Sequence, residues 1–567
     1  MSVYLHRGQY DLKGEKMFKK RGEAASVCEI IKNNTGFSVD ELSDMEKKEY
    51  GMRNSDLERF FAIVDAHEPK LATICGDYDV DGITSTFIMK EVLESKGYSV
   101  SVRFPKRMSE GFGLSEKAIS EIPDGSLVVT VDNGVTAFEA IDAAKKRGFT
   151  VIVTDHHIAG ERLPNADLII NPKAIPEQFD FDGYCGAGVA YKIAEKCGFS
   201  KKKLSELEVI AAIGTVADAM PLLFDNRKIV KEGLENARNG DMPKTLRALF
   251  NTLKIDENFV NEEDIGFKIA PCLNAPGRLL DDGAILSYKV LRGELEPEEI
   301  AELNIERQKL VKEAVTNAET NIINNDTKPG EPIVYIGEQQ EGISGIIAGQ
   351  LTENHHVPSF VFVRTEKGYK GSGRAPEGYN LKEMLDEVSD LLVFYGGHEC
   401  AAGCTVKFDS MAEFRNRISM ICNEKGIQAE DANVISYDLE IGESDLVDTI
   451  NEVEKYAPYG AANPAPVIKV IYTLEADKYG NKTKALGKDG SSIRFNGRNH
   501  SSAICFGGLE KYEELSRPDR ISAVGTLSMN HWGGYSYPQI KLIDFEADPN
   551  SGMETLGSMM TKKLRNK

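Results

Sequence analysis

Gly76-Asp77-Tyr78-Asp79-Val80-Asp81-Gly82 is the segment that decides the fold, and it directly follows the apolar run Leu71–Cys75. A short apolar run bounded by turn residues predicts a buried strand. Further runs of this kind alternate with amphipathic segments, which predicts a parallel sheet covered by helices. Ligands of such sheets bind at the carboxyl ends of the strands. The three aspartates therefore lie where an α/β fold places its functional site.

The elements of this sheet follow from the apolar pattern. Strands are expected at Leu71–Cys75, Val100–Phe104, Leu127–Val131, Val151–Thr154 and Leu168–Asn171. Helices are expected to begin near Gly82, Ser115, Ala137 and Val189. A longer helix is indicated downstream, where six apolar residues share one face at helical spacing: Ile300, Leu303, Leu310, Ala314, Ala318 and Ile322. At 1.5 Å per residue this helix would span roughly 40 Å, enough to bridge two domains.

Changes of pattern divide the 567 residues into several regions, as expected for a chain of this length. Residues 1–55 are expected to form a helical extension, 56–225 the parallel-sheet domain, and 226–330 a helical connector. After a Pro- and Gly-containing loop, a second α/β domain is expected at 331–430. A β-strand domain with Gly-rich turns follows at 431–548, and a disordered tail at 549–567.

The composition, with 41% hydrophobic and 28% charged residues, is that of a globular protein. The chain contains no apolar run of about 18 residues or more, so we expect no membrane span. The N-terminus has no apolar stretch, so we expect no secretory signal. Nine scattered cysteines show no disulfide framework, which favours the cytoplasm. The net charge of −21 argues against nonspecific coating of nucleic acid, but not against a local basic groove.

Polar clusters recur at the ends of later strands. Val131-Asp132-Asn133-Gly134 follows the third expected strand, and Thr154-Asp155-His156-His157 follows the fourth. Gly214-Thr215-Val216-Ala217-Asp218 adds a carboxylate after an apolar helical stretch. Taken singly, each cluster is typical of a turn or of exposed residues. Their repetition at strand ends instead predicts one site built from several clusters.

Aspartates with one or two histidines favour divalent ions such as Mn²⁺ or Mg²⁺. Two such ions can activate a water and neutralise the leaving oxygen of a phosphoester. An isolated calcium loop is the rival for the first segment, but Ile88 stands where that loop needs a glutamate. A zinc site at Cys400 and Cys404 is the other rival; their small, apolar neighbours indicate packed thiols instead.

These four clusters resemble the four motifs of the DHH phosphoesterase superfamily. Asn274–Arg278, Gly371–Arg374 and Gly396–Gly403 further resemble the RecJ-type single-strand-specific exonucleases. Because seven motifs occur in the expected order between about Leu71 and Phe545, the match is specific. The resemblance implies a DHH catalytic domain, a DHHA1-like substrate domain and a C-terminal β-barrel of the OB-fold type.

The resemblance also implies roles for single residues. Two metal ions would be held by Asp77, Asp79, Asp81, Asp132, His156 and Asp218. His157 would contact the scissile phosphate, and other phosphates would be held by Asn133, Arg278, Ser372, Arg374 and His398. Arginine suits this role because its planar fork binds phosphate oxygens in pairs. Cys75 stands where some members have a histidine ligand, which leaves open whether Asp77 or His157 compensates or one metal site is weaker.

The C-terminal β-region is locally basic. Between Ile468 and Arg498 lie seven basic and three acidic residues. Basic grooves with aromatic platforms bind single strands, because every base can stack on a ring. An ordinary β-domain with core aromatics is the alternative; the family's OB-fold at this position favours nucleic-acid binding, with Lys482, Lys484, Phe495 and Trp532 as candidates.

We therefore expect a cytoplasmic, Mn²⁺- or Mg²⁺-dependent exonuclease that hydrolyses single-stranded DNA. The resemblance implies 5′-to-3′ release of 5′-mononucleotides in recombination and repair, by a monomer with a single-strand-binding protein and a helicase as partners. One rival is a phosphodiesterase of the same superfamily acting on cyclic dinucleotides or short oligonucleotides. Another is a non-catalytic DNA-binding scaffold.

Overall fold

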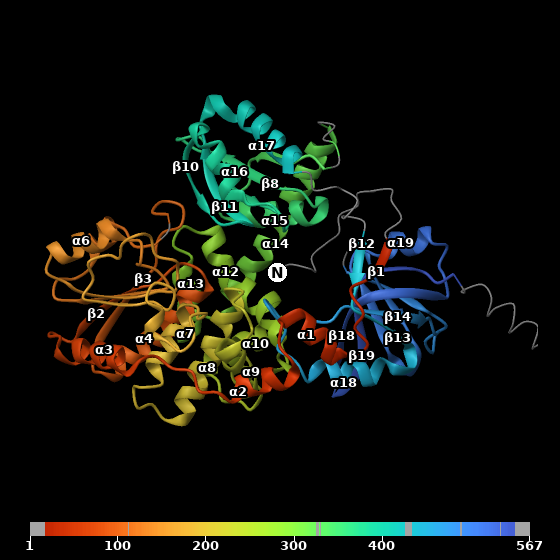
Figure 1. The fold of residues 1–567 in the computed structure, drawn as a ribbon, viewed down its shortest axis with the longest axis horizontal. Helices are drawn as coiled ribbons and strands as arrows, with labels where there is room; N and C mark the ends of the chain where they lie inside the picture. The colour runs from red at the N-terminus through yellow and green to blue at the C-terminus, as the bar shows by residue number, and fades with distance from the viewer. Residues whose placement is uncertain are drawn as a thin grey trace, which may run out of the picture. The chain divides into compact units, whose positions relative to one another are not determined.

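The computed structural model describes residues 17–549 except 112, 325–327, 329, 426–433, 488–489 and 533. The described residues fall into two compact units (Figure 1). The larger unit is Leu42–Gly426; the smaller combines residues from Met1–Glu41 and Ile427–Lys567. Among the described residues, no helix has both the length and the apolar character needed to span a membrane.

A five-stranded parallel sheet begins the larger unit, in the order β3-β2-β4-β5-β6. Its strands are β2 (Leu71–Cys75), β3 (Ser99–Arg103), β4 (Leu127–Val131), β5 (Thr150–Thr154) and β6 (Leu168–Ile170). All five expected strands are confirmed. Because β3 lies on one side of β2 and β4 on the other, the chain reverses direction across the sheet between them, and ligand crevices form at such points.

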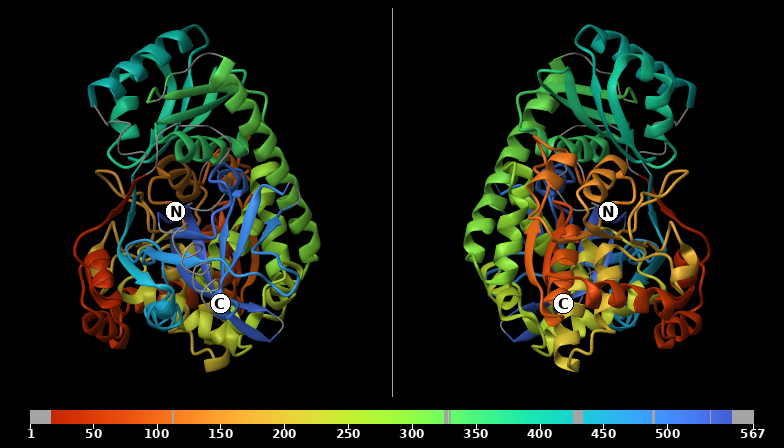
Figure 2. Two further views of the ribbon diagram at one scale, coloured as in Figure 1. Left: turned by 90° about the vertical axis from the view of Figure 1, so that its right-hand side faces the viewer. Right: turned by 90° about the vertical axis from the view of Figure 1, so that its left-hand side faces the viewer.

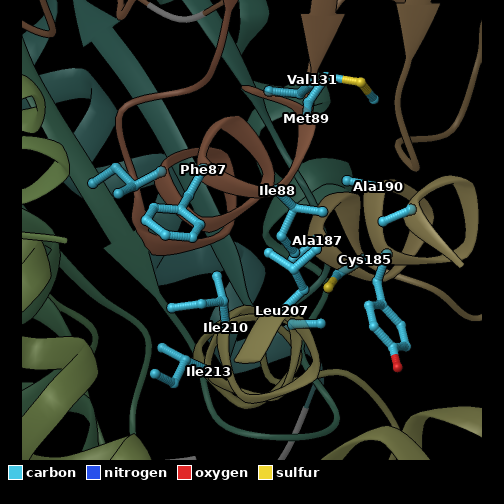
Figure 3. Packing of buried hydrophobic residues seen from close by; sticks show 14 of the residues in the cluster. Phe87, Ile88, Met89, Val131, Cys185, Ala187, Ala190, Leu207, Ile210 and Ile213 are labelled. Carbon is cyan, nitrogen blue, oxygen red and sulfur yellow. The ribbon is translucent and has the colours of Figure 1, made fainter. Parts of the chain in front are cut away.

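Helices α3 to α8 surround this sheet. They are α3 (Asn54–Ala66), α4 (Val80–Ser95), α5 (Glu116–Glu121), α6 (Phe138–Lys146), α7 (Gly186–Ala194) and α8 (Lys201–Ala217). Figure 3 shows α4, α7 and α8 packed through Phe87, Ala187 and Ile210. A Cβ atom on Gly214 of α8 would lie 2.5 Å from the Ala187 Cβ, so only glycine permits this approach. The close packing brings the start of α7 to the start of α4.

The connector is helical, as expected. It comprises α9 (Phe224–Arg238), α10 (Lys244–Thr252), α11 (Glu262–Asp264), the π-helix Ile265–Ile269, α12 (Ala270–Leu279), α13 (Ala284–Arg292) and α14 (Pro297–Asn324). The long helix is confirmed as α14, whose buried residues include Ile300, Ala314 and Ala318 (long green helix, Figure 2). Its 28 residues correspond to about 42 Å.

A second, mixed sheet completes the larger unit, in the order β10-β11-β9-β8-β7. Its strands are β7 (Ile333–Gly337), β8 (Ser359–Arg364), β9 (Tyr369–Arg374), β10 (Leu392–Gly397) and β11 (Ala401–Val406). The helices are α15 (Ser344–His355), α16 (Leu381–Glu387) and α17 (Met411–Lys425). α15 lies on one face of the sheet, and α16 and α17 lie on the other (Figure 1).

The smaller unit contains a seven-stranded sheet in the order β13-β14-β18-β19-β17-β16-β15. Its strands are β13 (Leu439–Gly442), β14 (Ile468–Thr473), β15 (Thr483–Leu486), β16 (Ser492–Asn496), β17 (Ser502–Cys505), β18 (Arg520–Trp532) and β19 (Tyr535–Ala547). Two helices, α18 (Leu446–Glu454) and α19 (Leu509–Glu514), accompany it. The expected tail lies almost wholly outside the described residues.

The N-terminal region differs from the expected helical extension. It contains α1 (Val27–Thr35) and α2 (Val39–Lys47), but it begins with a strand, β1 (Met17–Lys20). β1 pairs in parallel with β12 (Val434–Tyr437), more than 400 residues later. The short segment Met17-Phe18-Lys19-Lys20 does not by itself predict a strand. It forms one because β12 supplies its hydrogen-bond partners.

Candidate active site

The carboxyl end of β2 and the start of α4 carry Asp77, Asp79 and Asp81. The Asp79 carboxylate caps α4 by accepting the Gly82 main-chain N–H over 3.1 Å. Asp81 lies in the first turn of α4 and is buried. Its two oxygens accept the N–H groups of Gly186 and Ala187, at 2.7 and 2.8 Å. The N-terminus of α7 therefore holds the Asp81 carboxylate in place.

Asp132 and His156 come from the ends of β4 and β5. Asp132 adopts a φ of 60°, and both residues are buried. The His156 Nε2 atom lies 3.0 Å from the Asp132 Oδ1, 3.6 Å from the Asp218 Oδ2 and 3.7 Å from the Asp81 Oδ2. One imidazole nitrogen thus faces three carboxylates from three different segments, as expected from the repeated clusters.

All six predicted metal ligands enter groups that could hold an ion. The groups are Asp77–Asp79–Asp132, Asp81–His156–Asp218 and Asp132–His156–His157, and the ligand atoms within each lie within 4.8 Å of one another. Asp132 and His156 each belong to two of these groups. His157, predicted as a phosphate contact and as one of two residues that could compensate for Cys75, is also close enough to be a ligand.

Burial and mutual repulsion shift the ionisation of these groups. Burial, with the neighbouring Asp79, raises the pKa of Asp77 to about 7. Burial, with Asp81 and Asp79, raises the pKa of Asp218 to about 8, and the pKa of Asp132 is raised well above its usual value. Burial lowers the pKa of His156 to about 4, so its imidazole is neutral, as metal ligation requires.

The residues present fit divalent ions. Within the described residues, the buried atoms Asp77 Oδ1, Asp132 Oδ1, Asn133 Oδ1 and His156 Nδ1 have no hydrogen-bond partner. Buried polar atoms without partners are costly, and an ion at this place would satisfy the carboxylate oxygens. The donor set is mainly carboxylate oxygen with imidazole nitrogen, which suits Mn²⁺ and Mg²⁺.

His157 is held by Asp155, a residue that the sequence interpretation quoted but assigned no role. The Asp155 Oδ1 atom lies 2.7 Å from the His157 Nδ1. Burial alone would lower the pKa of His157, but this hydrogen bond and the Asp155 charge outweigh burial and raise the pKa to about 9. The imidazolium is therefore the main form at neutral pH and can bind an anion. In the sequence, the signal for this role of Asp155 was a carboxylate directly before a pair of histidines.

Three guanidinium groups gather beside the carboxylates. Arg278 of α12 lies close enough to Asp79, Arg107 and Arg374 for their charges to affect its pKa. Burial and the two neighbouring arginines lower that pKa to about 9. Burial and then Arg107 lower the pKa of Arg374. Among the described residues, none of the three arginines forms an ion pair with a carboxylate. Unpaired arginines that repel one another form a site for an anion.

Arg107 was missed by the sequence interpretation. Its guanidinium lies over the Tyr78 ring, 4.6 Å from the centroid. Asp281, in the turn after α12, accepts the main-chain N–H groups of Met108 and Ser109 and holds this loop. The available signal was a basic pair, Lys106 and Arg107, just after the second strand of a parallel sheet.

Ser372 and Arg374 share one face of β9, and His398 lies in the turn between β10 and β11. Gly397 has a φ of 141°, and a Cβ atom there would lie 2.4 Å from the Ala401 oxygen. Only glycine allows this turn, in which the His398 N–H donates to the same oxygen over 2.8 Å. His398 is exposed.

Asn133 differs from its predicted role. Its side-chain amide donates to the main-chain oxygens of Cys75 and Val131, at 3.0 and 2.9 Å. Both N–H donors are therefore used to tie the ends of β2 and β4, and only an acceptor oxygen remains. A phosphate oxygen needs a donor, so the structure does not support phosphate binding by Asn133.

The cysteines do not contribute ligands to the groups described. Cys75 is buried, and burial raises the pKa of its thiol to about 12. Asp77 and His157 both lie in potential metal groups, and Cys75 lies in none of the three groups found among the described residues. Cys404 packs in the core of the second sheet as expected, whereas Cys400 is exposed, contrary to the prediction.

The predicted strand-binding residues of the β-domain divide into two kinds. Phe495 is fully buried and packs edge-on against Tyr512 and Phe545, so the prediction that it is an exposed platform is wrong. Lys484 is exposed, and Lys482 forms an ion pair with Asp519 over 2.6 Å. The side chain of Trp532 lies outside the described part.

Exposed rings occur elsewhere in this domain. Tyr535 of β19 is 69% exposed, and its ring centroid lies 6.3 Å from that of Tyr537. The ring centroids of His500 and Tyr537 also lie 6.3 Å apart. Alternation along a strand does not by itself say which face is covered, so the sequence could not separate these rings from Phe495.

Comparisons with known proteins identify three domains. The DHH family N-terminal domain matches residues 72–215, the DHHA1 domain 333–424, and the RecJ OB domain 437–544. They occur in the order expected from the motifs. The expected fold class is confirmed.

Whole-chain relatives agree with these domains. The single-stranded-DNA-specific exonuclease RecJ of Bacillus subtilis is 34% identical over 483 residues, covering 83% of this chain but 60% of the relative. RecJ of Dickeya dadantii is 31% identical over 437 residues, covering 71% of this chain and 75% of the relative. A crystal structure of Thermus thermophilus RecJ with Mn²⁺ superposes with a TM-score of 0.73 at 25% identity, covering 92% of this chain and 75% of that one.

Proposed function

The chain belongs to the RecJ family of the DHH superfamily, and from that premise we propose that it is a metal-dependent exonuclease of single-stranded DNA. The chain spans only 60% of the Bacillus relative, so its activity is inferred from its own site as well as from the family. The proposed products are 5′-mononucleotides, released in the 5′-to-3′ direction during recombination and repair.

One observation carries this proposal: the potential metal groups and three unpaired arginines lie beside each other. Asp79 belongs to a metal group and is close enough to Arg278 for their charges to affect each other's pKa. Cations and guanidinium groups at one site favour a substrate with several phosphates in sequence. A nucleic-acid backbone has this chemistry.

The ions would be held by Asp77, Asp79, Asp81, Asp132, His156 and Asp218. When bound, Mn²⁺ or Mg²⁺ would lower the pKa of water and neutralise charge on the phosphodiester. The α7 N-terminus fixes the Asp81 carboxylate, and the neutral His156 presents Nε2 toward Asp132.

The remaining residues would bind and orient the strand. The His157 imidazolium, oriented by Asp155, would contact the scissile phosphate, while Arg278, Arg374 and Arg107 would hold phosphates by paired hydrogen bonds. Ser372 and His398 would add a hydroxyl and an imidazole donor. The OB domain would bind the strand through Lys484 and the rings of Tyr535 and Tyr537.

A direct test compares a single strand and a blunt duplex, both labelled at the 5′ end, with a cyclic dinucleotide labelled in its phosphates. With Mn²⁺, the wild-type chain should release a labelled mononucleotide from a single strand first, while a blunt duplex and a cyclic dinucleotide should persist. Asp132→Asn is the inactive control. Faster hydrolysis of the cyclic dinucleotide would favour the phosphodiesterase alternative, and strand binding without hydrolysis would favour the scaffold.

A cytoplasmic location, a monomeric state, and a single-strand-binding protein and a helicase as partners remain part of the proposal. They rest on the family and on the absence of a disulfide framework in the sequence.

A further inference from the structure

One face of the second sheet carries a strip without side chains. Ser372 of β9 lies opposite Gly403 of β11, which lies opposite Gly396 of the edge strand β10. A Cβ atom on Gly396 would meet nothing within 4 Å, and one on Gly403 would meet only the Gly371 oxygen, at 3.8 Å. α15 packs on this face over β8 and β9. We call the surface over Gly403 and Gly396 the open strip.

Phe394 stands at the outer end of the open strip. It lies opposite Thr405, which lies opposite Lys370, in the row of residues next to that of Ser372. Lys370, Ser372 and Arg374 share a face because side chains alternate along β9. The Phe394 side chain is 66% exposed. A large exposed ring is therefore on the same face as two proposed phosphate-binding residues.

A β-bulge places the ring there. Leu392 pairs with Val406 and Phe394 with Thr405, so Val393 is an extra residue in β10. Leu392 and Tyr395 pack toward the core on the opposite face. Without the extra residue, alternation would direct Phe394 to the same side as Leu392. Bulges re-aim side chains at functional positions, and this one exposes a ring that would otherwise be in the core.

We propose that Phe394 is a base-stacking residue of the substrate path: the single strand leaves Ser372 and Arg374, crosses the open strip, and stacks a base on the Phe394 ring. This inference rests on the proposed function. Glycines let a strand approach the main chain closely, and a ring accepts any base.

The sheet geometry indicates which base is involved. Two strand spacings of about 4.8 Å and two residues of about 3.3 Å place the Phe394 Cα roughly 12 Å from that of Ser372. At about 3.4 Å per stacked nucleotide, this distance corresponds to the third or fourth nucleotide beyond the phosphate at Ser372. A dinucleotide would be too short to reach the ring.

The test uses the full chain with Phe394→Ala, Phe394→Trp and a matched control, Met420→Ala. Met420 is 60% exposed on α17, which lies on the other face of the sheet. Binding of a short oligothymidylate and of a dinucleotide is measured without divalent ions, so that no hydrolysis interferes. Phe394→Ala should weaken oligonucleotide binding about fivefold or more and leave dinucleotide binding unchanged. Phe394→Trp should retain binding, and Met420→Ala should match wild type.

An abasic scan locates the contact. One base at a time is removed from the oligonucleotide; in wild type the loss should be largest near the third or fourth position, and it should disappear in Phe394→Ala. As a second variant, Gly396→Val should also weaken oligonucleotide binding, because its side chain would fill the open strip.

Equal binding by wild type and Phe394→Ala, or equal losses on the dinucleotide and the oligonucleotide, would overturn the inference. A change of oligomeric state in Phe394→Ala, with nucleotide binding unchanged, would instead assign the ring to a protein contact and overturn it too. If wild type binds strands through Phe394 but does not hydrolyse them, the proposed function fails while this inference stands.

Discussion

The His157 Nδ1 atom lies 2.7 Å from Oδ1 of Asp155, a buried carboxylate whose oxygens also accept the main-chain N–H groups of His156, His157 and Val135. Because all these donors point at Asp155, its position is fixed and it stays ionised. The Asp155 carboxylate thus fixes both the charge and the orientation of the His157 side chain. The second histidine of the cluster can therefore act as a cation while the first, His156, stays neutral.

Asp155→Asn should shift the pH dependence of hydrolysis. Without the carboxylate, the pKa of His157 should fall from about 9 toward its ordinary value of 6.5, so the imidazolium is lost at a lower pH. The alkaline limb of the pH–rate profile should move down by more than one pH unit. NMR titration of His157 gives the same pKa directly. Asp167→Asn, which neutralises a carboxylate that accepts the Val151 N–H, is the control. An alkaline limb that does not move in Asp155→Asn would show that His157 is not the titrating group.

Asp132→Asn and His156→Ala should each remove Mn²⁺ binding and reduce hydrolysis at least a hundredfold, because both residues belong to two potential metal groups. Titration calorimetry measures the binding, and circular dichroism checks the fold. Asp142→Asn, on the exposed side of α6, should change neither. More than a tenth of wild-type activity in saturating Mn²⁺ would contradict the assignment.

The metal-free protein should become less stable as the pH rises from about 4 to about 8. The pKa values of Asp77, Asp132 and Asp218 are raised in the folded state, so these carboxyls ionise more easily when the chain unfolds. Their protonated forms favour folding at low pH, and this advantage is lost as pH passes from the unfolded to the folded pKa. Melting temperatures across this range should fall less steeply in Asp218→Asn, and also with Mn²⁺. If the melting temperature fell equally steeply with pH in the metal-free wild type, in Asp218→Asn and in the Mn²⁺-bound protein, the raised pKa values would be contradicted.

Arg107→Ala should raise KM for single strands about tenfold or more, because it removes one charge-assisted phosphate contact. Arg107→Lys should restore little, since an ammonium cannot form the paired hydrogen bonds. Arg364→Ala is a matched control, because Arg364 also lies over a ring, 5.3 Å from the centroid of Phe408. A normal KM in Arg107→Ala would exclude it from the substrate site.

Phe495→Ala and Tyr535→Ala should separate stability from binding. Truncation of the buried Phe495 should destabilise the β-domain by about 3–5 kcal/mol. Truncation of the exposed Tyr535 should leave melting unchanged and weaken binding of long strands by about 1–3 kcal/mol. Thermal melting and strand affinity are measured on both; a binding loss only in Phe495→Ala would contradict the assignment of the rings.

The larger part of the metal site could be predicted from the sequence, because the ligands belong to short polar segments at the ends of apolar strands or, for Asp218, of an apolar helix. Parallel strands end at one edge of a sheet, so Asp79, Asp132 and His156 had to meet there. The contribution of the α7 N-terminus could not be predicted, since Gly186 and Ala187 reach Asp81 only through the packing of three helices. Arg107 was missed for a similar reason: a turn after α12 holds its loop.

The sequence by itself determined the catalytic sheet, the long helix α14 and the order of the domains, because local apolar period and local polar clusters specify them. Only the tertiary structure decided that Phe495 is buried in the core and Tyr535 is exposed. It also decided that the Asn133 amide donates to the ends of two strands, and that Met17–Lys20 is a strand. Each of these depends on a partner far away in the chain. A single extra residue in β10 likewise turns Phe394 outward, and only the pairing of β10 with β11 shows which residue is extra.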